Sequence, residues 1–410
     1  MKHFVGLLGA FFLLSPVVLA QEPDWNHFRG PNRDNHSFSK GIAKSWPDGG
    51  PKLLWKINTL GNGFSNLCFS GDTIYTMGDF NNRCFVLALN RANGEIKWRQ
   101  EIGGAGRIAN QQSPHCTPAC DGDGVYAMAP DGNFVALDAK TGEIRWRKNV
   151  RTEFGGSFMG QWGFAMSPII DDGKIVVPVG GDGGVVVAFN KAGNVVWRTT
   201  DLPDSAGYTS IVPVEIGGVR QYLSLSNNYL VGLSPTDGKI LWGGNFPARS
   251  AVASDPVLCG DVIMAACSYN VGGYFYRITK EGDTFKAFDF HGDDQNLQSH
   301  HGGIVAVGDH FYLLTNTQMV CVEAKTAKIV WENRSVGKGS LTYVDGVLIL
   351  RSERGDGTIA MIEATPEGYK ELGRFDQPER SNLSSWTYPV VVDKKLYIRD
   401  QGLLLVYDLN

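Results

Sequence analysis

The stretch FVALDAKTGEIRW, residues 134–146, recurs along the chain and decides the fold. Each copy joins an apolar run, a short turn and a second run that ends in an aromatic residue, and the turn contains Gly except in the copy ending at Trp331, where Ala327 replaces it. Five strong copies and one lone strand end in tryptophan, namely Trp55, Trp98, Trp146, Trp197, Trp242 and Trp331. Two weaker copies end near Phe288 and Phe375. A repeat of about 45 residues built from short strands is typical of a propeller blade.

A hairpin signal lies upstream of each copy, as in PACDGDGVYAMAPDG at residues 118–132. Its apolar strands are separated by Asp-Gly turns, which tolerate a positive φ. Each repeat is therefore interpreted as four antiparallel strands, and the eight outer strands predict an all-β, eight-bladed β-propeller. The Gly permits the last turn of each blade. The closing Trp is expected to pack against the next blade as a structural docking residue.

The two ends of the chain are expected to complete one blade. Residues 390–410 give three strands with no fourth, and residues 51–57 give a lone outer strand. Pairing them closes the ring and removes the exposed sheet edges. The propeller is thus assigned to residues 51–410. Residues 21–50 are expected to be irregular but packed on the propeller, because they contain Trp25, Phe28 and Trp46.

The N-terminus and the composition restrict where the protein acts. Residues 1–20 have a basic start, a short apolar run and small residues before Gln21, which is typical of a secretory signal peptide. A periplasmic or secreted monomer that does not span a membrane is expected. The net charge of −4 argues against a nucleic-acid partner. The seven cysteines have no zinc-site spacing, and most are predicted to be small buried residues.

The repeat resembles the tryptophan-docking motif of pyrroloquinoline quinone (PQQ) repeat propellers, within the quinoprotein alcohol dehydrogenase-like superfamily. Ala88–Trp98 and Ala136–Trp146 carry this resemblance, which is specific for the fold and weak for function. Quinoprotein dehydrogenases of this group bind PQQ and Ca²⁺ in the central funnel, whereas an outer-membrane assembly lipoprotein with the same fold does no chemistry. The adjacent cysteine pair, the calcium ligands and the catalytic Asp of the dehydrogenases are not matched here. The lipidated Cys of the lipoprotein is also missing. No cofactor is therefore expected, with PQQ and calcium as the alternative.

The loops that lead into the innermost strands are long and varied, and loops held on a rigid scaffold commonly carry binding sites. Their polar and aromatic residues are expected to surround the mouth of the central channel. The ligand-binding candidates are Arg107, Gln111, His115, Trp162, Tyr208, His300, His301, Lys338 and Trp386. Trp162 is expected to pack in the fold, with a floor under a flat cofactor as the alternative.

His300 and His301 lie in the stretch LQSHHGG, residues 297–303, just before a predicted innermost strand. Side chains of adjacent strand residues point to opposite sides. One ring is therefore expected to face the channel and the other to pack against a neighbouring blade, and no metal site is predicted.

No catalytic set can be assigned from the spacing of the residues. We expect a scaffold that binds an unknown small molecule or protein at the channel mouth. The alternatives are a PQQ-dependent dehydrogenase that oxidises alcohols or sugars, and a different enzyme that uses the channel, such as one acting on polysaccharide.

Overall fold

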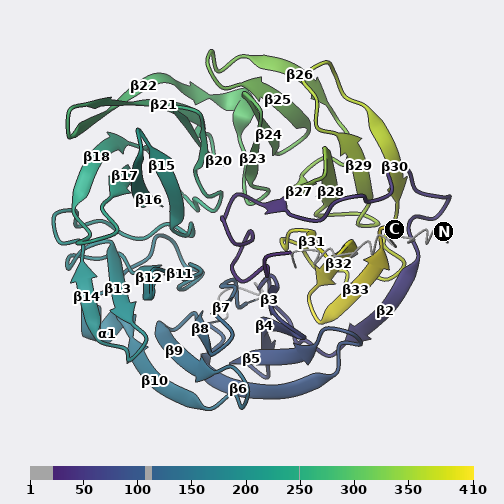
Figure 1. Cartoon of the computed structure of the whole chain (residues 1–410), viewed down its shortest axis with the longest axis horizontal. Helices are drawn as coiled ribbons and strands as arrows, with labels where there is room; N and C mark the ends of the chain where they lie inside the picture. Colours follow the sequence, from purple (N-terminus) through teal and green to yellow (C-terminus); the bar gives the residue numbers. More distant parts are fainter. Residues whose placement is uncertain (1–21, 107–112, 249) are drawn as a thin grey trace, which may run out of the picture.

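The computed structural model describes residues 22–106, 113–248 and 250–410. Eight sheets of antiparallel strands are arranged as blades around a central axis (Figure 1). The predicted all-β, eight-bladed propeller is confirmed. No helix in the described part of the chain is long and apolar enough to cross a membrane.

The strands of each blade follow one another from the axis to the rim. Blades one to four contain β3 (Cys68–Ser70), β4 (Thr73–Phe80), β5 (Arg83–Asn90) and β6 (Ile96–Gly104); β7 (Ala119–Cys120), β8 (Gly124–Met128), β9 (Asn133–Asp138) and β10 (Ile144–Asn149); β11 (Ile169–Asp171), β12 (Lys174–Pro178), β13 (Val186–Asn190) and β14 (Val195–Arg198); and β15 (Val212–Ile216), β16 (Val219–Leu225), β17 (Tyr229–Leu233) and β18 (Ile240–Asn245). Blades five to eight contain β19 (Val257–Cys259), β20 (Val262–Cys267), β21 (Gly272–Glu281) and β22 (Thr284–Asp294); β23 (Ile304–Val307), β24 (His310–Leu314), β25 (Met319–Glu323) and β26 (Ile329–Asn333); β27 (Gly339–Val344), β28 (Val347–Ser352), β29 (Ile359–Glu363) and β30 (Glu371–Phe375); and β31 (Val390–Val392), β32 (Lys395–Asp400), β33 (Leu403–Asp408) and β2 (Leu53–Asn58).

The ring closes as the sequence predicts, because β2 pairs with β33 in the last blade. The pairing is antiparallel and runs from Leu53 opposite Tyr407 to Asn58 opposite Leu403. The other described elements are β1 (His36–Ser37), the short helix α1 (Val150–Phe154) and the 3-10 turn η1 (Gln295–Leu297). The eight aromatic positions of the repeat all fall on outermost strands. Phe288, from a weak copy, is 52% exposed and lies free on the rim.

The tryptophans of the repeat contact the last turn of the following blade. The indole N–H of Trp98 donates to the carbonyl of Ala139 at 3.1 Å, and that of Trp146 donates to the carbonyl of Lys191 at 2.9 Å. Gly142 lies against the Trp98 ring with φ of +77°, and a Cβ there would come within 2.6 Å of the ring. The glycine is thus required both by the turn and by the ring that covers it.

Trp242 departs from this pattern, because blade five carries a weak copy of the repeat. Its indole N–H donates to the side-chain oxygen of Gln221 in its own blade, at 2.7 Å. Trp197 and Trp331 follow the general pattern and donate to the carbonyls of Pro235 and Thr365. Trp55 packs on Gly94 of the first blade.

The N-terminal segment, residues 22–50, crosses the middle of the ring and then runs out to the rim, where β2 begins (Figure 1). In blade two, the N–H of Cys120 donates to the carbonyl of Asn26 in this segment. In blade three, the N–H of Ile170 donates to the ring of His27 in this segment. Its β1 pairs in parallel with β27 of blade seven. The segment also contacts the turns between the first two strands of blades, as where Lys44 pairs with Asp345. The segment therefore closes the end of the channel at which these turns lie.

Two arginines of this segment are fully buried in the channel. Arg29 and Arg33 lie 3.7 and 3.6 Å from the same carboxylate, that of Asp255 in blade five. Arg29 also donates to the carbonyl of Ile304, and Arg33 donates to that of Pro168. A buried charge is tolerated only with such partners. These contacts hold the segment, which we call the plug, across the axis.

Candidate functional site

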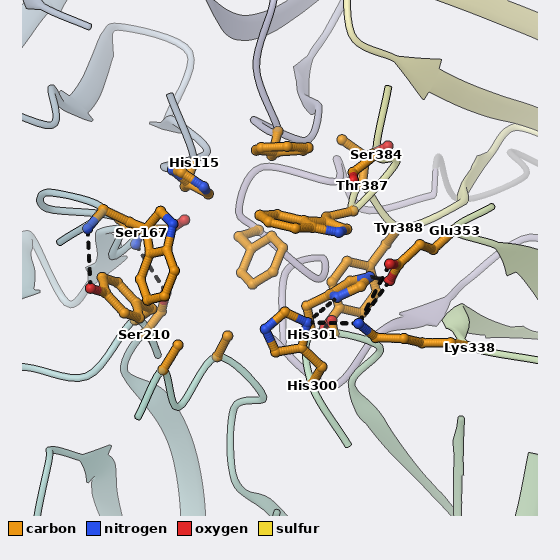
Figure 2. A pocket seen from close by; sticks show the side chains of 18 of the residues that line it. His115, Ser167, Ser210, His300, His301, Lys338, Glu353, Ser384, Thr387 and Tyr388 are labelled. Carbon is orange, nitrogen blue, oxygen red and sulfur yellow. Dashed lines mark hydrogen bonds and ion pairs between the residues drawn. The ribbon is translucent and has the colours of Figure 1, made fainter. Parts of the chain in front are cut away.

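A pocket of about 370 Å³ opens at the other end of the channel, on the face of the long loops. Figure 2 shows His300, His301, Lys338 and Glu353 grouped on one of its walls and Ser167 opposite them. The plug contributes Phe28 to the lining. The described residues that line the pocket are Phe28, Phe64, His115, Trp162, Ala165, Ser167, Tyr208, Ser210, Ala251, Ala253, Tyr269, His300, His301, Lys338, Glu353, Arg354, Ser384, Trp386, Thr387 and Tyr388.

Aromatic rings form much of the lining. Phe64 and Trp386 are stacked, with ring centroids 4.2 Å apart and an angle of 21° between the planes. His115 lies 5.0 Å from the Phe64 ring. Trp162 and Tyr208 form a second pair, in edge-to-face contact at 5.6 Å. Such rings offer flat apolar surfaces to a ligand with little side-chain entropy to lose.

A polar cluster made by four side chains lies beside these rings. The Nδ1 atoms of His300 and His301 are 3.1 Å apart. The Lys338 ammonium lies 3.1 Å from the Nδ1 of His300 and 3.2 Å from Oε2 of Glu353. The Nε2 of His301 is 3.5 Å from the same carboxylate oxygen. Titratable groups of three kinds therefore converge on one point of the pocket wall.

The local backbone explains why both histidine rings reach the pocket. His300 and His301 lie in a bend before β23 and not on the strand itself. The expectation that their rings point to opposite sides is therefore wrong, because the alternation of side chains applies only to extended strand backbone. Gly303 continues the bend with φ of +75°. A Cβ on Gly302 would meet the carbonyl of Gly339 at 2.2 Å, so this bend depends on its glycines.

Burial determines the charge of the histidines in the pocket. It lowers the pKa of His115 to about 4 and, together with the charge of Lys338, lowers the pKa of His300 to about 4. The pKa of His301 is held well below its usual range, chiefly by burial. All three rings are thus neutral at pH 7. The remaining charged residues of the lining are Lys338, Arg354 and Glu353, which gives the pocket one excess positive charge.

Most of the candidates predicted from the sequence come together here. His115, Trp162, Tyr208, His300, His301, Lys338 and Trp386 all line the pocket. Arg107 and Gln111 lie outside the described residues. The Trp162 ring packs against Tyr208, and both residues line the pocket wall.

Three residues that shape the site were not predicted from the sequence. Phe64 lies in the connection between β2 and β3, where the same loop rule would have found it. Tyr269 and Glu353 lie in the connections between the second and third strands of blades five and seven. These connections open on the same face, but no repeated signal distinguishes one such loop from another.

The fold and the aromatic mouth define a class: the chain is a propeller of the PQQ-repeat type. The family model described as outer membrane protein assembly factor BamB matches residues 48–152, 83–298 and 280–409. These overlapping matches span the whole propeller. The chain therefore belongs to this family.

Known proteins similar to the chain include outer membrane protein assembly factors and quinone-dependent alcohol dehydrogenases. The outer membrane protein assembly factor BamB of Yersinia pestis is 26% identical over 185 residues, which are 43% of this chain and 40% of that protein. The structure of BamB from Moraxella catarrhalis has a TM-score of 0.59 at 16% identity, over 87% of this chain and 97% of that one. The quinohemoprotein alcohol dehydrogenase of Comamonas testosteroni has a TM-score of 0.67 at 14% identity, over 94% of this chain and 80% of that one. The chain thus spans less than half of the Yersinia relative, and the likeness to the two structures concerns the fold alone.

The pocket does not offer the ligand set that calcium prefers. Ca²⁺ takes six to eight oxygen ligands, with carboxylates prominent among them. Among the described residues that line the pocket, Glu353 is the one carboxylate, and it is already paired with Lys338. The nearest other donors are imidazole nitrogens. A quinone and calcium centre of the dehydrogenase kind does not fit these residues.

Proposed function

We propose that the protein is an exported binding propeller that takes a small ligand, or a side chain of a protein partner, into the pocket at the channel mouth. The observation that carries this proposal is a pocket of about 370 Å³ closed below by the plug and lined by two aromatic pairs. Binding sites are commonly concave, mainly apolar and equipped with a few polar groups.

The charges of the lining indicate the kind of ligand. Lys338 and Arg354 outnumber Glu353, and Arg334 adds a third cation in the groove that continues from the pocket past Lys338 and Arg354. A flat apolar group would fit between the rings, and an anionic group would lie against Lys338. The pocket thus favours an aromatic or otherwise planar acid, free or carried by a partner protein.

The relatives support a binding role outside the inner membrane. The name of the Yersinia relative describes a factor in outer membrane protein assembly. The signal peptide predicted for residues 1–20 agrees with a periplasmic or secreted location.

Anilinonaphthalene sulfonate, an aromatic anion that fluoresces in apolar surroundings, is the probe for this proposal. It should bind the purified protein with one dominant site. Trp386→Ala should abolish that site, and Lys338→Met should weaken it about tenfold through loss of one charge-assisted contact. Phe288→Ala, which removes an exposed ring far from the pocket, should leave binding unchanged. Equal losses in all three variants, with folding verified by circular dichroism, would contradict the proposal.

The second candidate function is a PQQ-dependent dehydrogenase. In its favour are the Trp162 ring on the pocket wall and the likeness in fold to quinone-dependent alcohol dehydrogenases. The poor oxygen-donor set speaks against it. Calorimetry with PQQ and Ca²⁺, together with dye-linked alcohol oxidation on the same sample, separates the two functions. Micromolar binding that disappears in Trp162→Ala, with dye reduction, would favour the dehydrogenase.

A further inference from the structure

The rings of His300 and His301 at the pocket wall face each other with their Nδ1 atoms. Their Nδ1 atoms are 3.1 Å apart, while each Nε2 faces an outer partner. The Nε2 of His300 lies 3.0 Å from the Tyr269 hydroxyl, and that of His301 lies 3.5 Å from Oε2 of Glu353. With the proton of each neutral ring on Nε2, both outer contacts are favourable. Both Nδ1 lone pairs then face a common point.

In this tautomer the two lone pairs repel one another unless a cation lies between them, whereas a proton on one Nδ1 would turn the contact into a hydrogen bond. The Lys338 ammonium fills this role in part, at 3.1 Å from the Nδ1 of His300. The arrangement is nevertheless poorly satisfied. The Nε2 of His301 and Oε2 of Glu353 are both buried and make no hydrogen bond, although Oε2 forms an ion pair with Lys338. Buried polar atoms without partners are uncommon and require an explanation such as a bound ion.

The distances suit a transition metal. Zinc binds imidazole nitrogen at about 2.0–2.1 Å, which places two nitrogens of one tetrahedral site about 3.3 Å apart. The 3.1 Å between the Nδ1 atoms is close to this value. A carboxylate oxygen of Glu353 and one nitrogen of each ring all lie within 4.8 Å of one another. The Glu353 carboxylate lies on the Nε2 side of the His301 ring, so its side chain would have to turn toward the two Nδ1 atoms to complete three ligands.

We propose that His300, His301 and Glu353 bind a divalent transition metal ion, such as Zn²⁺, in the pocket wall. Imidazole and carboxylate together suit zinc, cobalt and related ions rather than calcium or magnesium. The Tyr269 hydroxyl would orient the His300 ring through its Nε2–H, a second contact that metal-binding histidines commonly make. The three ligands approach from the wall, so the remaining coordination positions face the pocket, where water or an acidic ligand would bind.

Lys338 is the internal competitor for this site. Its ammonium lies between His300 and Glu353, where a metal ion would meet strong repulsion. The side chain is 23% exposed and also lines the groove next to the pocket, so it has space to move aside. Metal binding and the Lys338–Glu353 ion pair are therefore mutually exclusive. This exclusion distinguishes the site from a fixed structural zinc centre and supplies the test.

The test is a titration of the purified mature protein with Co²⁺ after treatment with a chelator. Cobalt bound by nitrogen and oxygen ligands in a site of low coordination number gives strong visible absorption bands. Stoichiometric bands that Zn²⁺ removes are expected for the wild type. Lys338→Met should tighten binding at least about tenfold, since it removes the competing charge and keeps the chain length.

Ligand variants and a matched control complete the test. His301→Ala and Glu353→Gln should each weaken Co²⁺ binding between about tenfold and a hundredfold. His115→Ala, a buried histidine of the same pocket outside the cluster, should bind like the wild type. Thermal unfolding shows whether each variant is folded. The absence of bands in both the wild type and Lys338→Met would overturn the proposal, and so would an equal loss in His115→Ala. Failure of the aromatic probe to bind would leave this result unaffected, because the cobalt spectrum does not depend on it.

Discussion

The two ends of the central channel are built from similar groups but are completed differently. Each end brings histidine, a basic side chain and a carboxylate together inside the ring. At the closed end, Arg29 and Arg33 donate to backbone carbonyls and share Asp255, and the protein's own N-terminal segment fills the space. At the mouth, Lys338 and Glu353 border a pocket. The comparison indicates that the closed end serves stability and that the mouth is available for a ligand.

Removing the carboxylate at each end should give the largest difference between them. Asp255→Asn leaves two buried arginines without a counter-charge, and breaking a buried pair costs about 3–5 kcal/mol. Glu353→Gln leaves only the partly exposed Lys338 and the exposed Arg354, for an expected cost of about 1 kcal/mol. Urea unfolding of both variants measures these values. Equal costs at the two ends would break the comparison.

Acid should destabilise both ends of the channel. Burial and the charge of Arg33 lower the pKa of His27, at the closed end, to about 3, and burial lowers that of His115, at the mouth, to about 4. Both folded-state values lie below the unfolded value of about 6.5, so the fold is favoured by neutral rings. Their contribution is complete above pH 6.5 and is lost as the pH falls, by about 1.4 kcal/mol per pH unit for each ring until its folded pKa is reached.

His27→Gln tests the share of the closed end in this pH dependence. The variant can still accept the Ile170 N–H, which donates to the His27 ring at 2.9 Å. Unfolding followed in urea between pH 7 and pH 4.5 should show a slope smaller by about one ring's contribution. An unchanged slope would mean that the His27 side chain is not buried in its neutral form in the folded protein.

The packing between neighbouring blades should have a smaller effect on stability, which is independent of both ends of the channel. Gly142→Ala forces a side chain at positive φ into the Trp98 ring, for an expected loss of about 2–3 kcal/mol. The matched control is Gly173→Ala, which has a similar φ of +71° and nothing within 4 Å of the added Cβ. It should lose only about 1 kcal/mol. The difference between the two thermal unfolding midpoints measures the contact with the tryptophan.

Tyr269→Phe should have the smallest effect on stability. The residue is 43% exposed, and its hydroxyl lies 3.0 Å from the Nε2 of His300 in the pocket wall. The expected change in the free energy of unfolding is within about 0.5 kcal/mol, as for most surface substitutions. Cobalt affinity should nevertheless fall, because the ring of His300 would lose its orienting partner. A stability loss as large as that of Asp255→Asn would show that the mouth is also a structural element.

The repeat predicted the ring but not the contacts at its ends. Trp98 and Trp146 recur with their turns, so sequence alone placed them on outer strands. The plug depends on Arg29 meeting Asp255, far along the chain, and no local pattern encodes such a contact. At the mouth, His115 and Trp386 were found from their place before inner strands. Glu353 was missed because the loops between second and third strands carry no repeat, and the two histidines were misplaced because strand alternation does not extend into a bend.

The central claim is that the pocket at the channel mouth is the binding site of this propeller. A crystal structure of the protein with anilinonaphthalene sulfonate tests it most directly. The probe should lie among the Phe64, Trp386 and Trp162 rings, with its sulfonate against Lys338. Density for the probe only on the outer rim near Phe288, or in place of the plug, would contradict the claim.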